Sequence, residues 1–323
     1  MTVITSDLSR FPFPFRDDAY RYSTNVEPAL VWAETATGGW GDRILDIDDH
    51  YAAELAERSA ILAADPTRAA TSPHMRAAEW DALMFCLQRL AVEYPDRMTL
   101  HRENDAVRWS NALTGDDVAF TIGDDASVPG GPLRFLATQM QEDVALLDQR
   151  EDALWLDAGV ITFAADWSMG FDVGMRFLEI HGPVPRVHEE QIIVRAHQFL
   201  LRLQPAQAYR RTNWTMTVGR RLDTSTETYP EWGPDRTRVL DDPALPDLVH
   251  LRVEVQHLIR LPHSGAVMFL IRSYLEPLRA LANVPPWRDR LAAVLRELPD
   301  DMAEYKGIDK YRLLAADWLD GRR

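Results

Sequence analysis

Hydrophobic positions recur at helical spacing in several stretches of the chain. Between residues 77 and 94, apolar side chains return every three or four positions, which predicts an amphipathic helix that ends before Pro95. The same spacing predicts helices over 48–63, 188–203, the stretch after Pro285, and 308–318. A short helix is also expected after Leu133, continuing through Glu142 and Asp143.

Alternation of apolar and polar positions predicts strands in the second half of the chain. The expected strands are 144–148, 154–163, 213–220, 251–261 and 266–274. The last two are separated only by the turn at 262–265, so they should form a hairpin. One face of 251–261 carries the even-numbered residues Arg252, Glu254, Gln256, Leu258 and Arg260. That face is either open to solvent, as in many antiparallel sheets, or part of a site.

The order of these elements predicts an α+β protein. Two strands, a helical crossover and three further strands suit an antiparallel sheet with helical N- and C-terminal extensions. Residues 1–30 form an expected surface arm, and 115–132, rich in Asp, Gly and Pro, an expected loop. We therefore expect an N-terminal arm and helical region over 1–132, a core over 133–280 and a C-terminal helical extension over 281–323, packed as one compact unit.

Composition narrows the class of partner. The formal net charge of −15 repels nucleic acid at long range and suits a cationic small molecule or a basic protein. No apolar run approaches the roughly 18 residues of a membrane span, and the N-terminus does not resemble a signal peptide, so a cytoplasmic location is expected. The single cysteine, Cys86, excludes an intrachain disulfide and multi-cysteine metal sites; its place in 77–94 predicts a buried thiol.

The usual nucleotide-loop, zinc-protease, serine-hydrolase and c-type heme motifs do not occur, which leaves a group of histidines as candidate chemistry. His181, His188 and His197 lie close in sequence to Glu189 and Glu190. This set could supply two imidazoles and a carboxylate to a non-heme iron, although surface positions on a helix explain His188 and His197 better. His181 lies between an apolar stretch and a Gly-Pro-Val-Pro turn, which suits either a single axial heme ligand or a core histidine.

Five segments carry a resemblance to a known family. They are QEDVALL (141–147), DWSMGFDVGMRFLEIHGPVP (166–185), RTNW (211–214), LRVEVQHLIRLPHSGAVMFLIRSYLEPL (251–278) and EYKG (304–307). In order and spacing they resemble the heme-dependent oxidative N-demethylase family, the alpha-subunit type of dimethylamine monooxygenase. The resemblance spans about residues 45–311. It implies a PAS-like fold with heme b, and oxidation by O2 of a methyl group beside an amine nitrogen, with release of formaldehyde.

The resemblance also implies roles for individual residues. His181 becomes the proximal iron ligand, and Arg211, Asn213 and Arg272 become candidates for binding the cofactor. Glu254, Gln256 and Arg260 become the catalytic candidates. Glu254 would bind an ammonium group or relay a proton, and Arg211, Arg260 or Arg272 would bind the heme propionates. Each of these residues also fits an internal ion pair, such as Glu254 with Arg260 or with Arg252. Lys306 fits either an anchor or a pocket residue.

Partners and alternatives follow from the same comparison. No flavin or NADPH motif is present, so electrons should come from a separate reductase or ferredoxin, and a homo- or hetero-oligomer is possible. Asp172 and Val255 depart from the residues expected in the family, which places dimethylamine itself in doubt as the substrate. A heme-PAS gas or redox sensor without catalysis, and a non-heme iron oxygenase using His181 and His188, are the alternatives.

Overall fold

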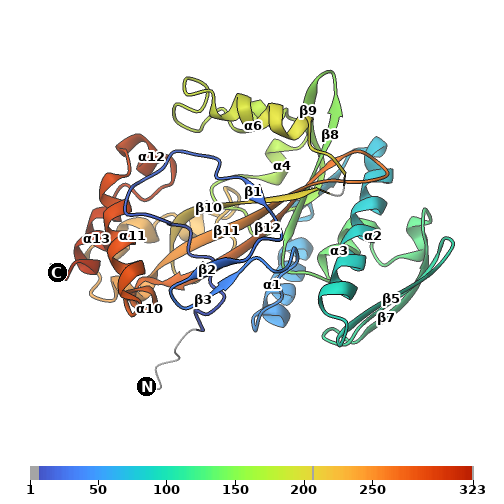
Figure 1. The fold of residues 1–323 in the computed structure, drawn as a ribbon, viewed down its shortest axis with the longest axis horizontal. Coiled ribbons are helices and arrows are strands. Elements are labelled where there is room, and N and C mark those ends of the chain that lie inside the picture. The colour runs from blue at the N-terminus through green and yellow to red at the C-terminus, as the bar shows by residue number, and fades with distance from the viewer. Residues whose placement is uncertain (1–6, 206, 322–323) are drawn as a thin grey trace.

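A seven-stranded antiparallel sheet forms the centre of the molecule, in the order β1-β10-β11-β12-β8-β9-β4 (Figure 1). The computed structural model describes residues 7–205 and 207–321. The strands are β1 (Glu27–Pro28), β4 (Ala69–Thr71), β8 (Asp143–Arg150), β9 (Ala153–Val160), β10 (Ala208–Val218), β11 (Val249–Arg260) and β12 (Val267–Pro277). The mixture of helices with antiparallel sheets confirms the α+β class.

Helices and two small sheets surround the central sheet. The helices are α1 (Tyr51–Ala64), α2 (Arg76–Glu93), α3 (Pro132–Ala137), α4 (Met169–Asp172), α5 (Phe177–Ile180), α6 (Ile192–Leu201), α7 (Tyr229–Trp232), α8 (Asp235–Arg238), α9 (Leu245–Leu248), α10 (Leu278–Ala282), α11 (Pro285–Glu297), α12 (Asp300–Tyr305) and α13 (Arg312–Leu319). The small sheets are β2 (Ala33–Thr35) with β3 (Gly38–Trp40), and β5 (Met98–Glu103), β6 (Ala106–Asn111) and β7 (Asp116–Thr121). None of the helices in the described ranges is long and apolar enough to cross a membrane.

The two faces of the central sheet pack against different layers. One face contacts α1–α3 towards one end and α10–α13 towards the other. The opposite face, which includes Leu258 and Val267, packs against α4, α5 and α6. The buried Cys86 lies in the first of these cores, as the helical pattern of 77–94 predicts.

Several predicted elements are confirmed within a few residues. They are the helices at α1, α2, α6, α11 and α13, and the strands at β8, β9, β10, β11 and β12, the last two forming the expected hairpin. The prediction for the stretch after Leu133 is wrong in its extent, because α3 ends at Ala137 and Asp143 begins β8. The expected surface arm contains β1, and its first six residues lie outside the described ranges.

The sequence pattern did not predict the three-stranded sheet β5–β7, part of which lies in the expected loop 115–132. Its strands are largely exposed and carry many charged side chains, so their buried apolar residues are limited to Met98, Val107, Trp109 and Phe120. For the even-numbered face of 251–261, the alternative of a solvated face is also wrong. Arg252 is fully buried and Glu254 is 7% exposed, because the residues that follow β9 cover this face.

Candidate functional site

Four of the expected site residues form one hydrogen-bonded row across β10 and β11. Arg211 is paired with Gln256 and Asn213 with Glu254 in the register of these strands, and directly paired residues share a face of the sheet. Arg211 Nη1 donates to Gln256 Oε1 at 2.8 Å. Gln256 Nε2 donates to Glu254 Oε2 at 3.0 Å, and Asn213 Nδ2 donates to the same oxygen at 3.4 Å. The row therefore converges on one carboxylate oxygen.

Arg252 holds the other oxygen of that carboxylate. Its Nε donates to Glu254 Oε1 at 3.2 Å, so the guanidinium compensates the buried negative charge. The remaining nitrogens of Arg252 donate to the carbonyl oxygens of Leu222 and Phe163 and to Ser273 Oγ. Arg252 thus fixes the position of Glu254, a role that the sequence left open as one of two possible ion pairs.

His181 lies at the end of α5 with a defined tautomer. Its Nδ1 lies 2.8 Å from the carbonyl oxygen of Phe177, and because a carbonyl can only accept, Nδ1 carries the proton and Nε2 presents a lone pair. Nε2 has no hydrogen-bond partner among the described residues, and this atom is not completely buried. Burial, together with the positive charge of Arg211, lowers the pKa of His181 to about 4, so the imidazole is neutral near pH 7.

The helix α5 and the polar row lie on the same face of the sheet, because Phe177 of α5 contacts Phe269, which is paired with Leu258 on the even-numbered face of β11. Lys306, which directly follows α12, responds to the same groups: burial and Arg211 lower its pKa to about 8, and Glu254 opposes this shift. Lys306 Nζ donates to the carbonyl oxygen of Trp214 at 2.6 Å. Lys306 therefore both anchors the end of α12 on the edge of β10 and borders the site.

Two expected site residues, Arg260 and Arg272, make their contacts elsewhere. All three nitrogens of Arg260 donate to main-chain oxygens, three of them at the end of α6 (Leu200, Leu201 and Leu203) and one in the β11–β12 turn (Gly265). Arg272 lies on the opposite face of the sheet, where it forms ion pairs with Glu54 and Asp48. The structure leaves neither guanidinium a free nitrogen for a cofactor.

The remaining histidines do not assemble around His181. His188 is exposed as expected, whereas His197 is buried and stacks on Phe177, which corrects its expected surface position. In the described part of the chain, the one group of three metal-ligating side chains close enough to share an ion is His74, Asp148 and Asp157. The set based on His181 and His188 is therefore not formed. Arg150 already donates to both of the aspartates near His74.

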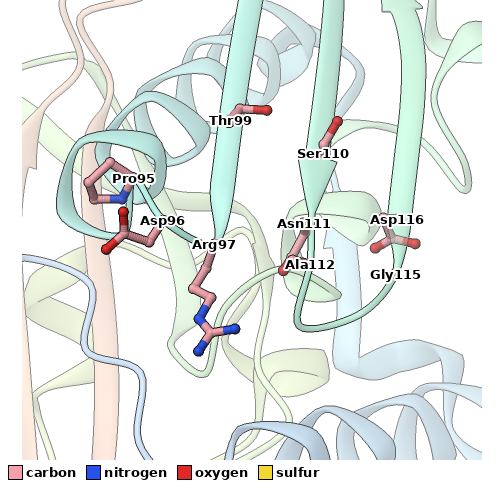
Figure 2. A pocket seen from close by; sticks show the side chains of 9 residues that line it. All are labelled: Pro95, Asp96, Arg97, Thr99, Ser110, Asn111, Ala112, Gly115 and Asp116. Atoms are coloured by element: carbon pink, nitrogen blue, oxygen red, sulfur yellow. The ribbon is translucent and has the colours of Figure 1, made fainter.

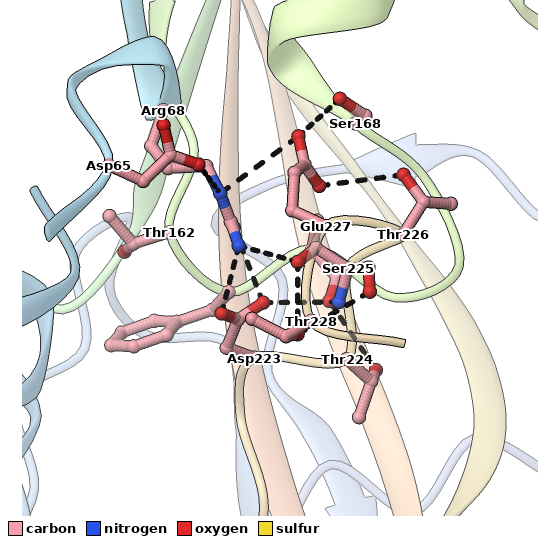
Figure 3. Close-up of polar contacts among 12 residues, drawn as sticks. Asp65, Arg68, Thr162, Ser168, Asp223, Thr224, Ser225, Thr226, Glu227 and Thr228 are labelled. Atoms are coloured by element: carbon pink, nitrogen blue, oxygen red, sulfur yellow. Dashed lines mark hydrogen bonds and ion pairs between the residues drawn. The ribbon is translucent and has the colours of Figure 1, made fainter. Parts of the chain in front are cut away.

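A buried network supports the segment that leads to His181 (Figure 3). Arg68, which precedes β4, donates to Asp223 at 3.0 Å and to Ser225 at 2.6 Å. Glu227 in the same loop accepts a hydrogen bond from Ser168, the residue before α4. These contacts hold α4 against the loop after β10, and α5 follows a few residues later.

Two pockets lie outside the polar row. One of about 340 Å³ lies between the ends of β5, β6 and β7 and contains none of the expected site residues (Figure 2). The other, of about 450 Å³, lies between α6 and the start of β10. It is lined by Val194, Arg195, Gln198, Phe199, Arg202, Leu203, Gln207 and Tyr209.

The chain also matches a known protein family over the region that contains these residues. The family model described as "Haem-dependent oxidative N-demethylase, alpha subunit-like" matches residues 36–315. The matched span contains His181, the polar row on β10 and β11, and Lys306.

Proposed function

The chain belongs to the haem-dependent oxidative N-demethylase, alpha subunit-like family, and from this premise we propose that it is a heme-dependent monooxygenase that demethylates an amine. In this proposal a PAS-like core binds heme b, and O2 and external electrons are consumed as formaldehyde is released. The family's description names an enzyme, which favours catalysis over the sensor alternative. Its designation as alpha subunit-like indicates assembly with further subunits.

The tautomer of His181 is the observation that carries the proposal. Histidines that bind metals usually donate their second ring N–H to a carbonyl or carboxylate, which orients the ring and leaves the other nitrogen for the metal. His181 has this arrangement with Phe177 and is neutral near pH 7. His181 would therefore be suited to hold the iron of a heme through Nε2.

Arg211 fits a second contact to the same group. Its Nε donates to the carbonyl oxygen of Thr24 and its Nη1 to Gln256, while Nη2 has no partner in the described ranges. A guanidinium with a free nitrogen suits a carboxylate such as a heme propionate. Of the three arginines considered for this role, Arg211 alone retains such a nitrogen and lies near His181.

Glu254 is the proposed partner of the substrate nitrogen. Its carboxylate is held in place by Arg252, Asn213 and Gln256, so a protonated amine would meet a fixed negative group. Bound heme would supply the activation of O2 and the oxidation of the methyl group. The chain itself would orient the amine through Glu254 and exclude bulk water with the apolar residues between α5 and the sheet, including Phe177 of α5 and Phe269 of β12.

Release of formaldehyde tests the proposal. The protein reconstituted with heme is supplied with O2, a ferredoxin-based reducing system and a panel of methylated amines, and formaldehyde is measured. We expect formaldehyde to form with at least one amine, in proportion to O2 consumed. A protein that binds heme normally but releases no formaldehyde across the panel would contradict N-demethylation.

A further inference from the structure

The longest segment of the chain without acidic residues spans 191–222. It contains no Asp or Glu, although the whole chain carries a formal charge of −15. This segment includes α6 and β10, and its exposed residues include Arg195 and Arg202. Neither arginine forms an ion pair with any residue in the described ranges, and the one side-chain contact of Arg202 is a 3.3 Å hydrogen bond to Gln198. Two exposed arginines without an ion pair thus lie on this segment of an acidic protein.

These arginines border the 450 Å³ pocket between α6 and β10. Its apolar residues are Val194, Phe199, Leu203 and Tyr209, and the Phe199 and Tyr209 rings meet edge to face at 5.0 Å. Aromatic side chains together with arginine are enriched at the centres of protein interfaces. We name the pocket and the two arginines the α6 patch.

The α6 patch lies close to the candidate site along two routes. Tyr209 is two residues before Arg211 on the same face of β10, which separates their Cα atoms by about 7 Å. On the inner side of α6, His197 stacks on Phe177, and the Phe177 ring lies 4.3 Å from that of His181. One helix, about 10 Å across, therefore separates the surface from His181.

We propose that the α6 patch is the docking surface for an acidic [2Fe–2S] protein that delivers electrons to the site. The inference rests on the proposed function, which needs an external donor, and on the complementarity between the free arginines and an acidic partner. In the transfer, the reduced cluster loses one electron and a ferric heme held by His181 gains it. No bond is formed or broken in this step.

Binding of an oxidised plant-type [2Fe–2S] ferredoxin to the heme-loaded protein provides the test, measured by isothermal titration calorimetry. We expect binding at low ionic strength that weakens as salt is added, because exposed charges are screened. The double variant R195E/R202E should raise Kd at least tenfold, whereas R195K/R202K should stay near the wild type. R108E is the matched control, since Arg108 is an exposed arginine on the separate β5–β7 sheet.

Stopped-flow reduction of the heme by the reduced ferredoxin gives a second readout. R195E/R202E should lower the rate of heme reduction at least tenfold. The proposal would be overturned by the absence of binding at low ionic strength, or by equal binding of wild type and R195E/R202E.

Reduction by dithionite separates failure of the docking surface from failure of the proposed function. A variant that dithionite still reduces normally retains its heme site, whereas a wild type with no heme spectrum contradicts the proposed function itself.

Discussion

Most polar contacts of the candidate site converge on Glu254. Both of its carboxylate oxygens are occupied, one by Arg252 and the other by Asn213 and Gln256. A carboxylate held in this way cannot rotate freely, so it offers a preorganised contact for an ammonium group. The same contacts mean that its removal would also leave Arg252 buried without its carboxylate partner.

Glu254→Gln tests the charge of this residue with little change of shape. The amide can still accept from Arg252, but it no longer attracts a protonated amine. Because a hydrogen bond to a charged group is worth about 1.5–3 kcal/mol, we expect KM for the amine to rise by about 10- to 100-fold. Steady-state formaldehyde release measures this change. Glu103→Gln, at an exposed position of β5, is the control, and equal KM values in the two variants would contradict the role of Glu254.

Glu142 provides a pH-dependent test of the opposite face of the sheet. The side chain is 1% exposed, one oxygen accepts from the Asp46 main chain, and the other has no partner among the described residues. Burial raises the pKa of Glu142 to about 7, above its ordinary value of 4.5. The folded protein therefore holds an extra proton between these values, and the stability it contributes is lost as pH rises from about 4.5 to 7.

Glu142→Gln should remove this loss. When the pH is raised from 5 to 8, the free energy of unfolding of the wild type should fall by about 1–3 kcal/mol relative to that of the variant. Each unit of pKa is worth about 1.4 kcal/mol. Urea denaturation at the two pH values measures the difference. Parallel pH profiles for the two proteins would show that Glu142 titrates in the same range whether folded or unfolded.

At the scale of elements, Arg260 explains how α6 is attached to the sheet. The last carbonyl groups of a helix have no partner within the helix, and Arg260 on β11 supplies hydrogen bonds to those of Leu200 and Leu201 and to Leu203 beyond them. This role differs from the catalytic role that the family resemblance implied. The contacts of Arg260 also fix the position of α6, the helix that carries Arg195 and is followed by Arg202.

Arg260→Met distinguishes anchoring from catalysis. Loss of several charge-assisted hydrogen bonds to buried carbonyl groups should lower the free energy of unfolding by about 2–4 kcal/mol and increase amide hydrogen exchange in α6. Arg202→Met, at the exposed residue that directly follows α6, should change stability by less than about 0.5 kcal/mol. A stable R260M protein with normal exchange in α6 and no turnover would instead indicate catalysis.

The elements differ in how far the sequence predicts them. The β11–β12 hairpin has long apolar alternation and a short turn, so both strands and their connection are predictable. The sheet β5–β7 has few inward apolar residues, which leaves little periodic signal. The 262–265 turn sets the register of the hairpin, and that register pairs Arg272 with Val255 and Ser273 with Glu254. Arg272 therefore lies on the face of the sheet opposite to Glu254.

At the scale of the whole molecule, one sheet brings together segments that are distant in sequence. β1 and β4 come from the expected N-terminal region and join strands of the expected core, while Lys306 reaches the edge of β10 from the C-terminal region. Of the residues that the family resemblance implied, Arg211, Asn213, Glu254 and Gln256 form one hydrogen-bonded row, and His181 contacts Phe177 on the same side of the sheet. The ion pair of Glu254 with Arg252 was one of the alternatives that the sequence allowed, whereas the contacts of Arg252 with Phe163 and Leu222 are set by tertiary packing and could not be predicted.

The central claim is that His181 binds the iron of a heme through Nε2. The absorption spectrum of the heme-reconstituted protein tests this most directly, in the ferric and the dithionite-reduced state. We expect a Soret band and visible bands of histidine-ligated heme in the wild type and in His188→Ala, whose histidine is exposed in the same segment. His181→Ala should lose or strongly shift these bands. A wild type without a Soret band, or a spectrum unchanged in His181→Ala, would contradict the account.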